Sequence, residues 1–141
     1  MFQPNRIVYL DGVIQSAREN LEAYHEALVH PVMLTHDNPK RIAIIGGGEG
    51  ATLMEVLKHK SVEKVQMIEI DEEMVKTSRQ YLPEWSDCSD IIGSTKWCGD
   101  DERADIFYED ALAWFIDRYS DEGKYVNENP PKFDVMIMDA L

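Results

Sequence analysis

A short apolar run followed at once by a glycine cluster is the strongest constraint on the fold of this 141-residue chain. The run is Ile42-Ala43-Ile44-Ile45, and an unbroken apolar stretch of this kind is typical of a strand buried on both faces of a parallel sheet. The cluster is Gly46-Gly47-Gly48-Glu49-Gly50, and apolar residues then recur at helical spacing. Because glycine lets the backbone turn sharply, the segment predicts a strand, a tight loop and a helix.

The same alternation continues along the rest of the chain. Further strands are expected at 64–68, 104–108 and 133–138, and helices at 51–59, 72–82 and 111–119. Alternating strands and helices imply an α/β domain in which a parallel sheet carries helices on both faces. The polar stretches 84–103 and 121–132 are expected to be loops, the first of them a surface insertion. Since the chain stops three residues after the last expected strand, we expect the C-terminal part of the sheet to be missing.

The first forty residues form a separate element in this interpretation. Asp11-Gly12 between two apolar stretches predicts a β-hairpin, and a helix is expected at 19–29, ended or kinked by Pro31. We place a boundary in the loop that follows. Residues 1–38 are then an N-terminal hairpin with a linking helix, and residues 39–141 are a partial nucleoside-binding domain.

The charge of the chain narrows the class of ligand. Lys and Arg number 14 against 27 Asp and Glu, which gives a net charge of −13. This balance argues against nucleic acid or an anionic membrane as a partner, and it suits a cationic ligand. The sequence has no apolar run near 18 residues and residues 1–6 do not resemble a signal peptide, so we expect a cytoplasmic protein without a membrane span.

The cysteines and histidines are interpreted as structural. Two cysteines do not make a disulfide framework, so Cys88 and Cys98 are expected to be reduced thiols. His30, His36 and His59 have no ligand partners at metal spacing along the chain, so we expect them to be structural or surface residues. No metal site is predicted.

Four carboxylates follow the four expected strands: Glu49, Glu69, Asp110 and Asp139. In an open α/β sheet, ligands bind outside the carboxyl ends of the strands, near the point where the strand order reverses. A single acidic residue at such a place is often only a helix cap, and Asp110 fits that alternative. Four together predict an acidic ligand site at one edge of the sheet.

The spacing of the loop and the second carboxylate indicates a nucleoside. Glu69 comes nineteen residues after Gly50, where an acidic side chain can accept hydrogen bonds from both ribose hydroxyls. Glu49 in the loop would repel a pyrophosphate or the carboxylate of S-adenosylmethionine, but would attract an ammonium group. The site therefore favours decarboxylated S-adenosylmethionine, which carries an amine and a sulfonium but no carboxylate.

The sequence resembles the aminopropyltransferase family, which contains the spermidine, spermine and thermospermine synthases. The resemblance runs from about residue 7 to residue 141. Its anchors are Asp11 to Gln15, Tyr24-His25-Glu26, His36 to Pro39, Gly46 to Gly50, Glu69-Ile70-Asp71, Asp110 and Asp139. The family most often has aspartate where Glu49 stands. Gln15 to Ala17, Tyr24 to Glu26, residues 28–31 and Glu49 look most similar to the thermospermine synthase branch.

The resemblance also implies the fold and the residues that contact the nucleoside. The expected fold is the Rossmann-like sheet of class I methyltransferases. The glycines Gly46, Gly48 and Gly50 would let the backbone approach the ligand, and Gln15 and His25 match contacts to the cofactor. Glu69 matches the ribose ligand and Ile70 the residue that packs on the adenine. Asp110 matches the residue that receives the adenine amino group, with Ala111 beside it where the family usually has glycine.

Three further residues match the positions that handle the amines. Glu49 matches the ligand of the aminopropyl amine, Tyr24 a contact to the amine substrate, and Asp139 the catalytic aspartate. Asp139, with help from Tyr24, would remove the proton of the attacking amine and hold its nitrogen in line. In the family a second aspartate follows three positions later, beyond the end of this chain.

The implied reaction moves the aminopropyl group of decarboxylated S-adenosylmethionine to a polyamine amine and releases 5′-methylthioadenosine. The branch resemblance favours spermidine as the acceptor and thermospermine as the product. Two enzymes remain as alternatives: a spermidine synthase that uses putrescine, and an S-adenosylmethionine-dependent putrescine N-methyltransferase. After the aminopropyltransferases and the methyltransferases, the third function class that stays open is a non-catalytic nucleoside-binding or oligomerisation module. No metal or prosthetic group is implied, and the full-length protein is expected to be a homo-oligomer, a dimer or a tetramer.

Overall fold

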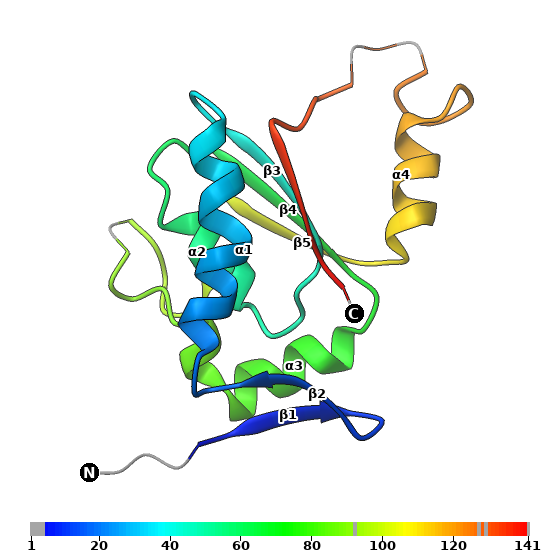
Figure 1. Ribbon diagram of the computed structural model, residues 1–141. Coiled ribbons are helices and arrows are strands. Elements are labelled where there is room, and N and C mark those ends of the chain that lie inside the picture. Colours follow the sequence, from blue (N-terminus) through cyan, green and yellow to red (C-terminus); the bar gives the residue numbers. More distant parts are fainter. Residues whose placement is uncertain (1–4, 92, 127, 129, 141) are drawn as a thin grey trace.

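The computed structural model describes residues 5–91, 93–126, 128 and 130–140, and its centre is a four-stranded parallel sheet (Figure 1). The strands are β3 (Arg41–Gly46), β4 (Lys64–Glu69), β5 (Ala104–Tyr108) and β6 (Val135–Asp139). Their spatial order is β5-β4-β3-β6. The chain therefore steps outward from β3 through β4 to β5, and β6 returns to the other side of β3. The strand order reverses between β3 and β6, and this defines the switch point of the sheet.

Helices flank this sheet. They are α1 (Leu21–Thr35), α2 (Ala51–Leu57), α3 (Glu72–Tyr81) and α4 (Ala111–Tyr119). Figure 1 shows α1 and α2 side by side against one face, with α4 on the opposite side. Two short 3₁₀ turns, Pro83–Ser86 and Cys98–Asp100, lie in the connection between α3 and β5. The predicted alternation of strands and helices is thus observed, with element ends shifted by one or two residues.

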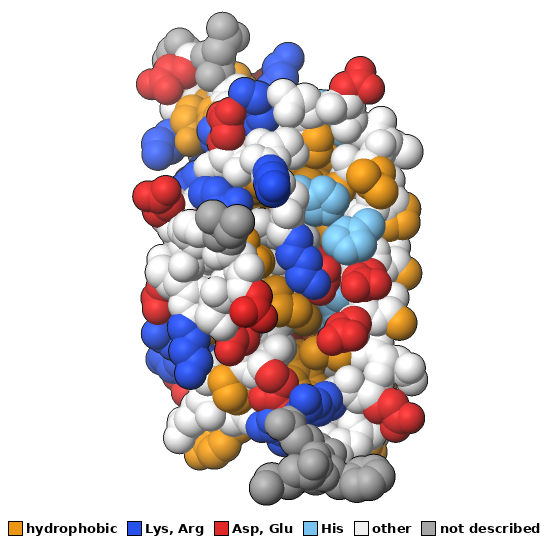
Figure 2. All heavy atoms as spheres, turned by 90° about the vertical axis from the view of Figure 1, so that its left-hand side faces the viewer, with side chains coloured by type: hydrophobic (Ala, Val, Ile, Leu, Met, Phe, Trp, Pro, Cys, Tyr) orange, Lys and Arg blue, Asp and Glu red, His pale blue; other side chains and the backbone are white. Residues whose placement is uncertain are grey.

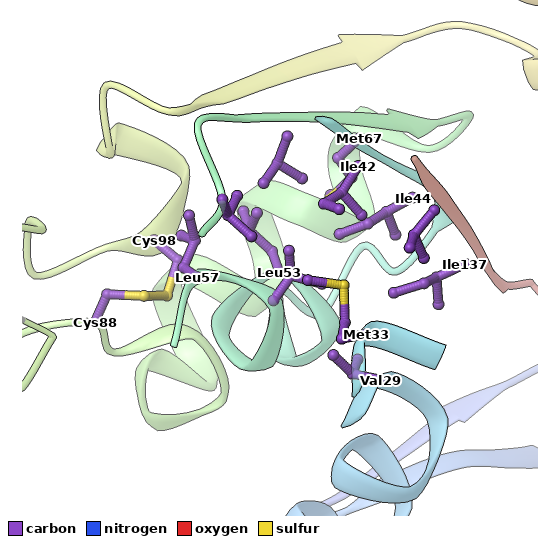
Figure 3. Close-up of a cluster of buried hydrophobic side chains, with 14 of the residues drawn as sticks. Val29, Met33, Ile42, Ile44, Leu53, Leu57, Met67, Cys88, Cys98 and Ile137 are labelled. Carbon is purple, nitrogen blue, oxygen red and sulfur yellow. A yellow bond between two sulfur atoms is a disulfide. The ribbon is translucent and has the colours of Figure 1, made fainter. Parts of the chain in front are cut away.

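The core lies between the sheet and the α1–α2 pair. Ile42 and Ile44 of β3 and Leu53 of α2 are at most 1% exposed, as the apolar pattern of these segments predicts. Figure 3 shows Val29 and Met33 of α1 next to them in the same cluster. This packing fixes α1 against α2, and so sets the position of the residues that α1 carries toward the carboxyl ends of the strands.

The predicted end of the first helix was wrong. Pro31 lies inside α1, which continues to Thr35. A proline in a helix interior removes one backbone hydrogen bond and costs about 3 kcal/mol. Val29 and Met33, on either side of Pro31, are 0% and 1% exposed, so burial of one continuous helical face outweighs that cost. Sequence rules treat proline as a helix end because they do not include this tertiary packing.

The prediction of free thiols was also wrong, because Cys88 and Cys98 form a disulfide. Their Cα atoms are 5.1 Å apart and both side chains are fully buried. A backbone hydrogen bond from Cys88 to Lys96 and a bridge between Asp87 and Trp97 fold this segment back on itself. The cysteine count alone did not show that the insertion is a closed, structured loop against the core.

The N-terminal hairpin consists of β1 (Ile7–Leu10) and β2 (Val13–Ala17), paired antiparallel as predicted. Asp11 and Gly12 both have positive φ, 49° and 82°, which is the backbone that a two-residue Asp-Gly turn requires. Ser16 of β2 accepts a hydrogen bond of 2.8 Å from the indole of Trp85, and this buried contact ties the hairpin to the domain. None of the described helices is long and apolar enough to cross a membrane. Residues 1–4, part of the segment assessed for a signal peptide, lie outside the described residues.

Candidate active site

A cavity of about 430 Å³ lies at the carboxyl ends of β3, β4 and β6, at the switch point. Register places Gly46 of β3 opposite Asp139 of β6, so the glycine loop and the last strand end side by side. Ten of the twelve predicted site residues line this cavity: Gln15, Tyr24, Gly46, Gly48, Glu49, Glu69, Ile70, Asp110, Ala111 and Asp139. His25 and Gly50 do not line it. Residues from strands far apart in the sequence thus meet at one cavity, as the position of the carboxylates predicts.

The glycine loop passes so close to β6 that side chains would not fit. At Gly46, φ is 82° and an added Cβ would overlap the backbone carbonyl of Asp139. Gly47 donates its N–H to the same carbonyl at 3.1 Å. Gly50 also has positive φ, 87°, and a Cβ there would lie 2.6 Å from Ser86, so its role is to turn the chain into α2 rather than to contact a ligand directly.

Asp139 is held by a residue that the sequence analysis missed. Thr52, fully buried in the first turn of α2, donates its hydroxyl to Asp139 Oδ2 at 2.6 Å. Burial raises the pKa of Asp139; the Thr52 hydrogen bond and the nearby His25 ring oppose this rise, while the Glu49 charge adds to it. A carboxylate with a raised pKa is a stronger base. The sequence signal that could have identified Thr52 is its polar side chain in the first turn of the helix after the glycine loop.

His25 lies behind the cavity wall and faces Glu49. Its ring is 2% exposed, Nδ1 is 2.8 Å from the carbonyl of Leu21, and Nε2 is 3.7 Å from Glu49 Oε2. Because a carbonyl only accepts, Nδ1 carries the proton and Nε2 faces the carboxylate. Burial lowers the pKa of His25, but Glu49, the Leu21 carbonyl and the Asp139 charge together outweigh it, so the pKa is raised.

Tyr24 stands beside His25 with its ring at the mouth of the cavity. The two ring centroids are 4.8 Å apart and nearly perpendicular. Partial burial raises the pKa of the Tyr24 phenol, and the charges of Asp139 and Glu49 raise it further. The phenol is therefore a hydrogen-bond donor at neutral pH, next to two carboxylates.

Glu69 forms the opposite wall with Gly48. Its side chain is 8% exposed, and Oε1 accepts a hydrogen bond of 2.9 Å from the backbone of Asp71. A Cβ at Gly48 would lie 3.1 Å from Glu69 Oε2 and 3.0 Å from Met74. A side chain at position 48 would therefore crowd Glu69 Oε2 and Met74. Ile70 beside it is 70% exposed, which is a large apolar surface at a cavity rim.

Asp110 has two functions in this structure. It caps α4 by accepting a hydrogen bond of 2.8 Å from the backbone of Ala113 on Oδ1, and it also lines the cavity. Ala111 follows as the first residue of α4. The capping interpretation of Asp110 and its place in the site are therefore compatible, since capping uses only one of its oxygens.

The charge of the cavity is one-sided. No Lys or Arg lines it among the described residues. The five carboxylates that line it are Glu49, Glu69, Asp71, Asp110 and Asp139. His25, Glu49 and Asp139 also bring three ligand atoms within 4.8 Å of one another, which is compact enough for a metal ion or for one ammonium group. A cavity of this charge attracts cations and repels phosphate groups.

Comparisons with known proteins agree with this geometry. A family model described as "Spermine/spermidine synthase domain" matches residues 21–141. The chain is 45% identical to polyamine aminopropyltransferase 1 of Hyperthermus butylicus over 134 residues, which cover 95% of this chain and 40% of the relative. It is 40% identical over 139 residues to a polyamine aminopropyltransferase of Thermoanaerobacter sp. strain X514, covering 99% of this chain and 43% of that one.

Solved structures show the same fold. A spermidine synthase in complex with the transition-state analogue AdoDATO matches with a TM-score of 0.74 and 35% identity, over 96% of this chain and 39% of that one. The spermidine synthase of Thermotoga maritima matches with a TM-score of 0.72 and 36% identity, over 96% and 40%. The predicted fold class and the family resemblance are confirmed. The chain spans about two fifths of the length of these relatives.

Proposed function

Because the chain belongs to the spermine/spermidine synthase family, we propose that its cavity binds decarboxylated S-adenosylmethionine and a polyamine for aminopropyl transfer. The observation that carries this proposal is the cavity lined by five carboxylates without a Lys or Arg among its described residues. Both substrates are cations, and bringing them together costs repulsion that these carboxylates offset. No metal or prosthetic group takes part in the proposed reaction.

The nucleoside would occupy the half of the cavity formed by β4 and α4. Glu69 Oε1 accepts a hydrogen bond from the backbone of Asp71. Glu69 Oε2 makes no such contact and would accept hydrogen bonds from the ribose hydroxyls. Ile70 would cover one face of the adenine. Asp110 caps α4 with one carboxylate oxygen, and its other oxygen would accept a hydrogen bond from the adenine amino group. Gln15 of β2 lines the cavity from the hairpin side and would add a cofactor contact.

The amines would occupy the half near α1 and β6. Glu49, 12% exposed at the side chain and paired with His25, would bind the amine of the aminopropyl group. Asp139 would accept a proton from the attacking amine, since only the unprotonated nitrogen has a lone pair for attack on the carbon beside the sulfonium. The C–S bond then breaks and its electrons leave with the sulfur of methylthioadenosine. Tyr24 would hold the acceptor nitrogen in line.

The acceptor is the finer part of the proposal. Motifs such as Tyr24-His25-Glu26 and Glu49 favour spermidine, with thermospermine as the product. The solved relatives are spermidine synthases, so putrescine is the second candidate acceptor. The full-length protein should be supplied with decarboxylated S-adenosylmethionine and either amine, and the polyamine product identified by mass. Asp139→Asn should lower kcat about 10²- to 10⁴-fold, the range usual for a general base.

Two outcomes would overturn the proposal when S-adenosylmethionine is also assayed and calorimetry measures the binding of both cofactors. Methyl transfer from S-adenosylmethionine to putrescine, without aminopropyl transfer, would make the protein an N-methyltransferase. Binding of neither cofactor would favour a non-catalytic module. Near-normal turnover by Asp139→Asn at neutral pH would instead leave the cofactor assignment intact but remove the base.

Two properties of the whole protein belong to the same proposal. The hairpin exposes Tyr9, Val13 and Ile14 by 53%, 62% and 56%, an apolar surface suited to contact between subunits of a homo-oligomer, which sedimentation measures. The net charge of −13 fits the absence of nucleic-acid and membrane partners, and the proposed location is the cytoplasm. The Cys88–Cys98 disulfide argues against that location, because disulfides are rare in the cytosol. Cell fractionation shows whether the full-length protein is in the cytoplasm or outside it.

A further inference from the structure

A second cluster of ligating side chains lies outside the acidic cavity, between α1 and α2. Glu26 and His30 lie four residues apart on α1, and Glu55 and His59 are spaced in the same way on and just after α2. Glu26 and His30 share one face of α1, which packs against α2, and His30 lies 2.9 Å from His59 and 3.3 Å from Glu55, so the two pairs face one another. Figure 2 shows histidine side chains gathered on this face of the molecule with acidic side chains beside them.

Glu55 is the unexpected member of this cluster. It is 0% exposed in the middle of α2, and a buried carboxylate needs compensation for the hydration it loses. Lys58 meets Oε1 at 2.6 Å. Oε2 has no hydrogen-bond partner among the described residues, although His30 Nε2 is 3.3 Å away. The nitrogen and the oxygen thus face each other without an aligned hydrogen bond between them.

His59 orients the ring of His30. Nδ1 of His30 is 2.9 Å from Nε2 of His59, which is a hydrogen bond between the two rings. When Nδ1 of His30 donates the proton of that bond, its Nε2 presents a lone pair toward Glu55. Histidines that bind metals are commonly held in this way, with the second ring nitrogen fixed by a hydrogen bond.

From this arrangement we propose that Glu26, His30 Nε2 and Glu55 Oε2 bind a divalent transition-metal ion of the zinc type, with His59 as the positioning residue. One ligand atom from each of the three residues lies within 4.8 Å of the others. Zinc with bonds of about 2.0–2.1 Å spaces tetrahedral ligands roughly 3.4 Å apart, so the exposed Glu26 side chain needs only a small movement. Water completes the coordination on the solvent side, where His30 is 31% exposed.

The mixed donor set selects the class of ion. Imidazole nitrogen suits zinc, nickel and copper, whereas magnesium and calcium prefer an all-oxygen site. The ion would join α1 to α2. Since α1 carries Tyr24 and His25 and α2 begins at the glycine loop, this contact would stabilise the scaffold of the proposed active site without taking part in its chemistry.

The test is titration of the metal-free full-length protein with Zn²⁺ by calorimetry, together with nickel and magnesium as comparison ions. We expect binding of zinc and nickel but not of magnesium, and a melting temperature that rises with zinc and falls again with chelator. His30→Gln should weaken zinc binding at least about tenfold, since even outer-shell partners are worth about 10- to 100-fold. Glu26→Gln should weaken binding in the same direction, and this exposed residue does not endanger folding.

Matched controls separate this site from the acidic cavity. His36→Gln, at a histidine of similar exposure elsewhere on the surface, and Glu22→Gln, one turn before Glu26, should leave zinc affinity unchanged. Lys58→Met should tighten zinc binding, because it removes the cation that competes for Glu55. Zinc affinity unchanged in both His30→Gln and Glu26→Gln would place the ion outside this cluster and overturn the proposal, as would the absence of zinc binding.

Discussion

Replacing Thr52 with valine tests how the scaffold controls the proposed base. Valine has nearly the same shape, so Thr52→Val removes the 2.6 Å hydrogen bond to Asp139 Oδ2 while keeping the buried volume. A hydrogen bond to a charged group contributes about 1.5–3 kcal/mol, and this one stabilises the ionised form of Asp139 more than the protonated form. Its loss should therefore raise the pKa of Asp139 further above its ordinary value, in the direction in which burial already acts.

The consequence is a pH-dependent loss of activity. At a pH below the pKa of Asp139 in both proteins, 1.5–3 kcal/mol corresponds to an ionised fraction that is at most roughly 10- to 150-fold smaller in the variant. The acidic limb of kcat/KM against pH should move to higher pH, and the difference from wild type should shrink as the pH rises. Thr52→Ser keeps the hydroxyl and should restore the wild-type limb.

The assay is methylthioadenosine release by the full-length protein across the pH range, with circular dichroism to verify folding. If the acidic limb of Thr52→Val coincides with that of wild type, the pKa of the catalytic group does not depend on this hydrogen bond. Either Asp139 is then not the base, or Thr52 does not bond to it in the working enzyme.

Three further predictions concern stability and the fit of the loop. Asp139→Asn should raise the melting temperature at pH 7, because the raised pKa means that the ionised carboxylate destabilises the folded state; the gain should vanish near pH 3. Arg103 holds the pKa of Asp101 at about 2, below 3.8, so Asp101→Asn should cost about 2 kcal/mol in urea unfolding at neutral pH and progressively less as the pH falls toward 2. Gly48→Ala should weaken methylthioadenosine binding in calorimetry with little change in melting temperature, because its Cβ meets only side chains. Gly46→Ala should lower the melting temperature, because at Gly46 φ is positive and the new Cβ overlaps the backbone of Asp139.

Much of the fold and of the cavity could be predicted from the sequence because local patterns and topology agree. The apolar run of β3 and the Asp-Gly turn of the hairpin each determine their structure over a few residues. The carboxyl ends of parallel strands meet at one edge, so Glu69 and Asp139 could be placed together without any knowledge of their contacts.

The features that sequence reasoning missed depend on contacts between distant segments. Pro31 stays within α1 because Val29 and Met33 are buried on both sides of it. The disulfide forms because the insertion folds back, which the count of cysteines does not encode. His30 was assigned a structural or surface role from its spacing along the chain, yet the approach of Glu55 from a second helix places a buried carboxylate beside it.

The central claim is that Glu49 selects a cofactor with an amine and without a carboxylate, and calorimetry with both forms of the cofactor tests it most directly. The wild-type full-length protein should bind decarboxylated S-adenosylmethionine more tightly than S-adenosylmethionine. Glu49→Gln should weaken binding of the decarboxylated form by about 1.5–3 kcal/mol, the contribution of a charged hydrogen bond, and so narrow the ratio of the two affinities. An affinity ratio that stays at its wild-type value in Glu49→Gln would contradict the account.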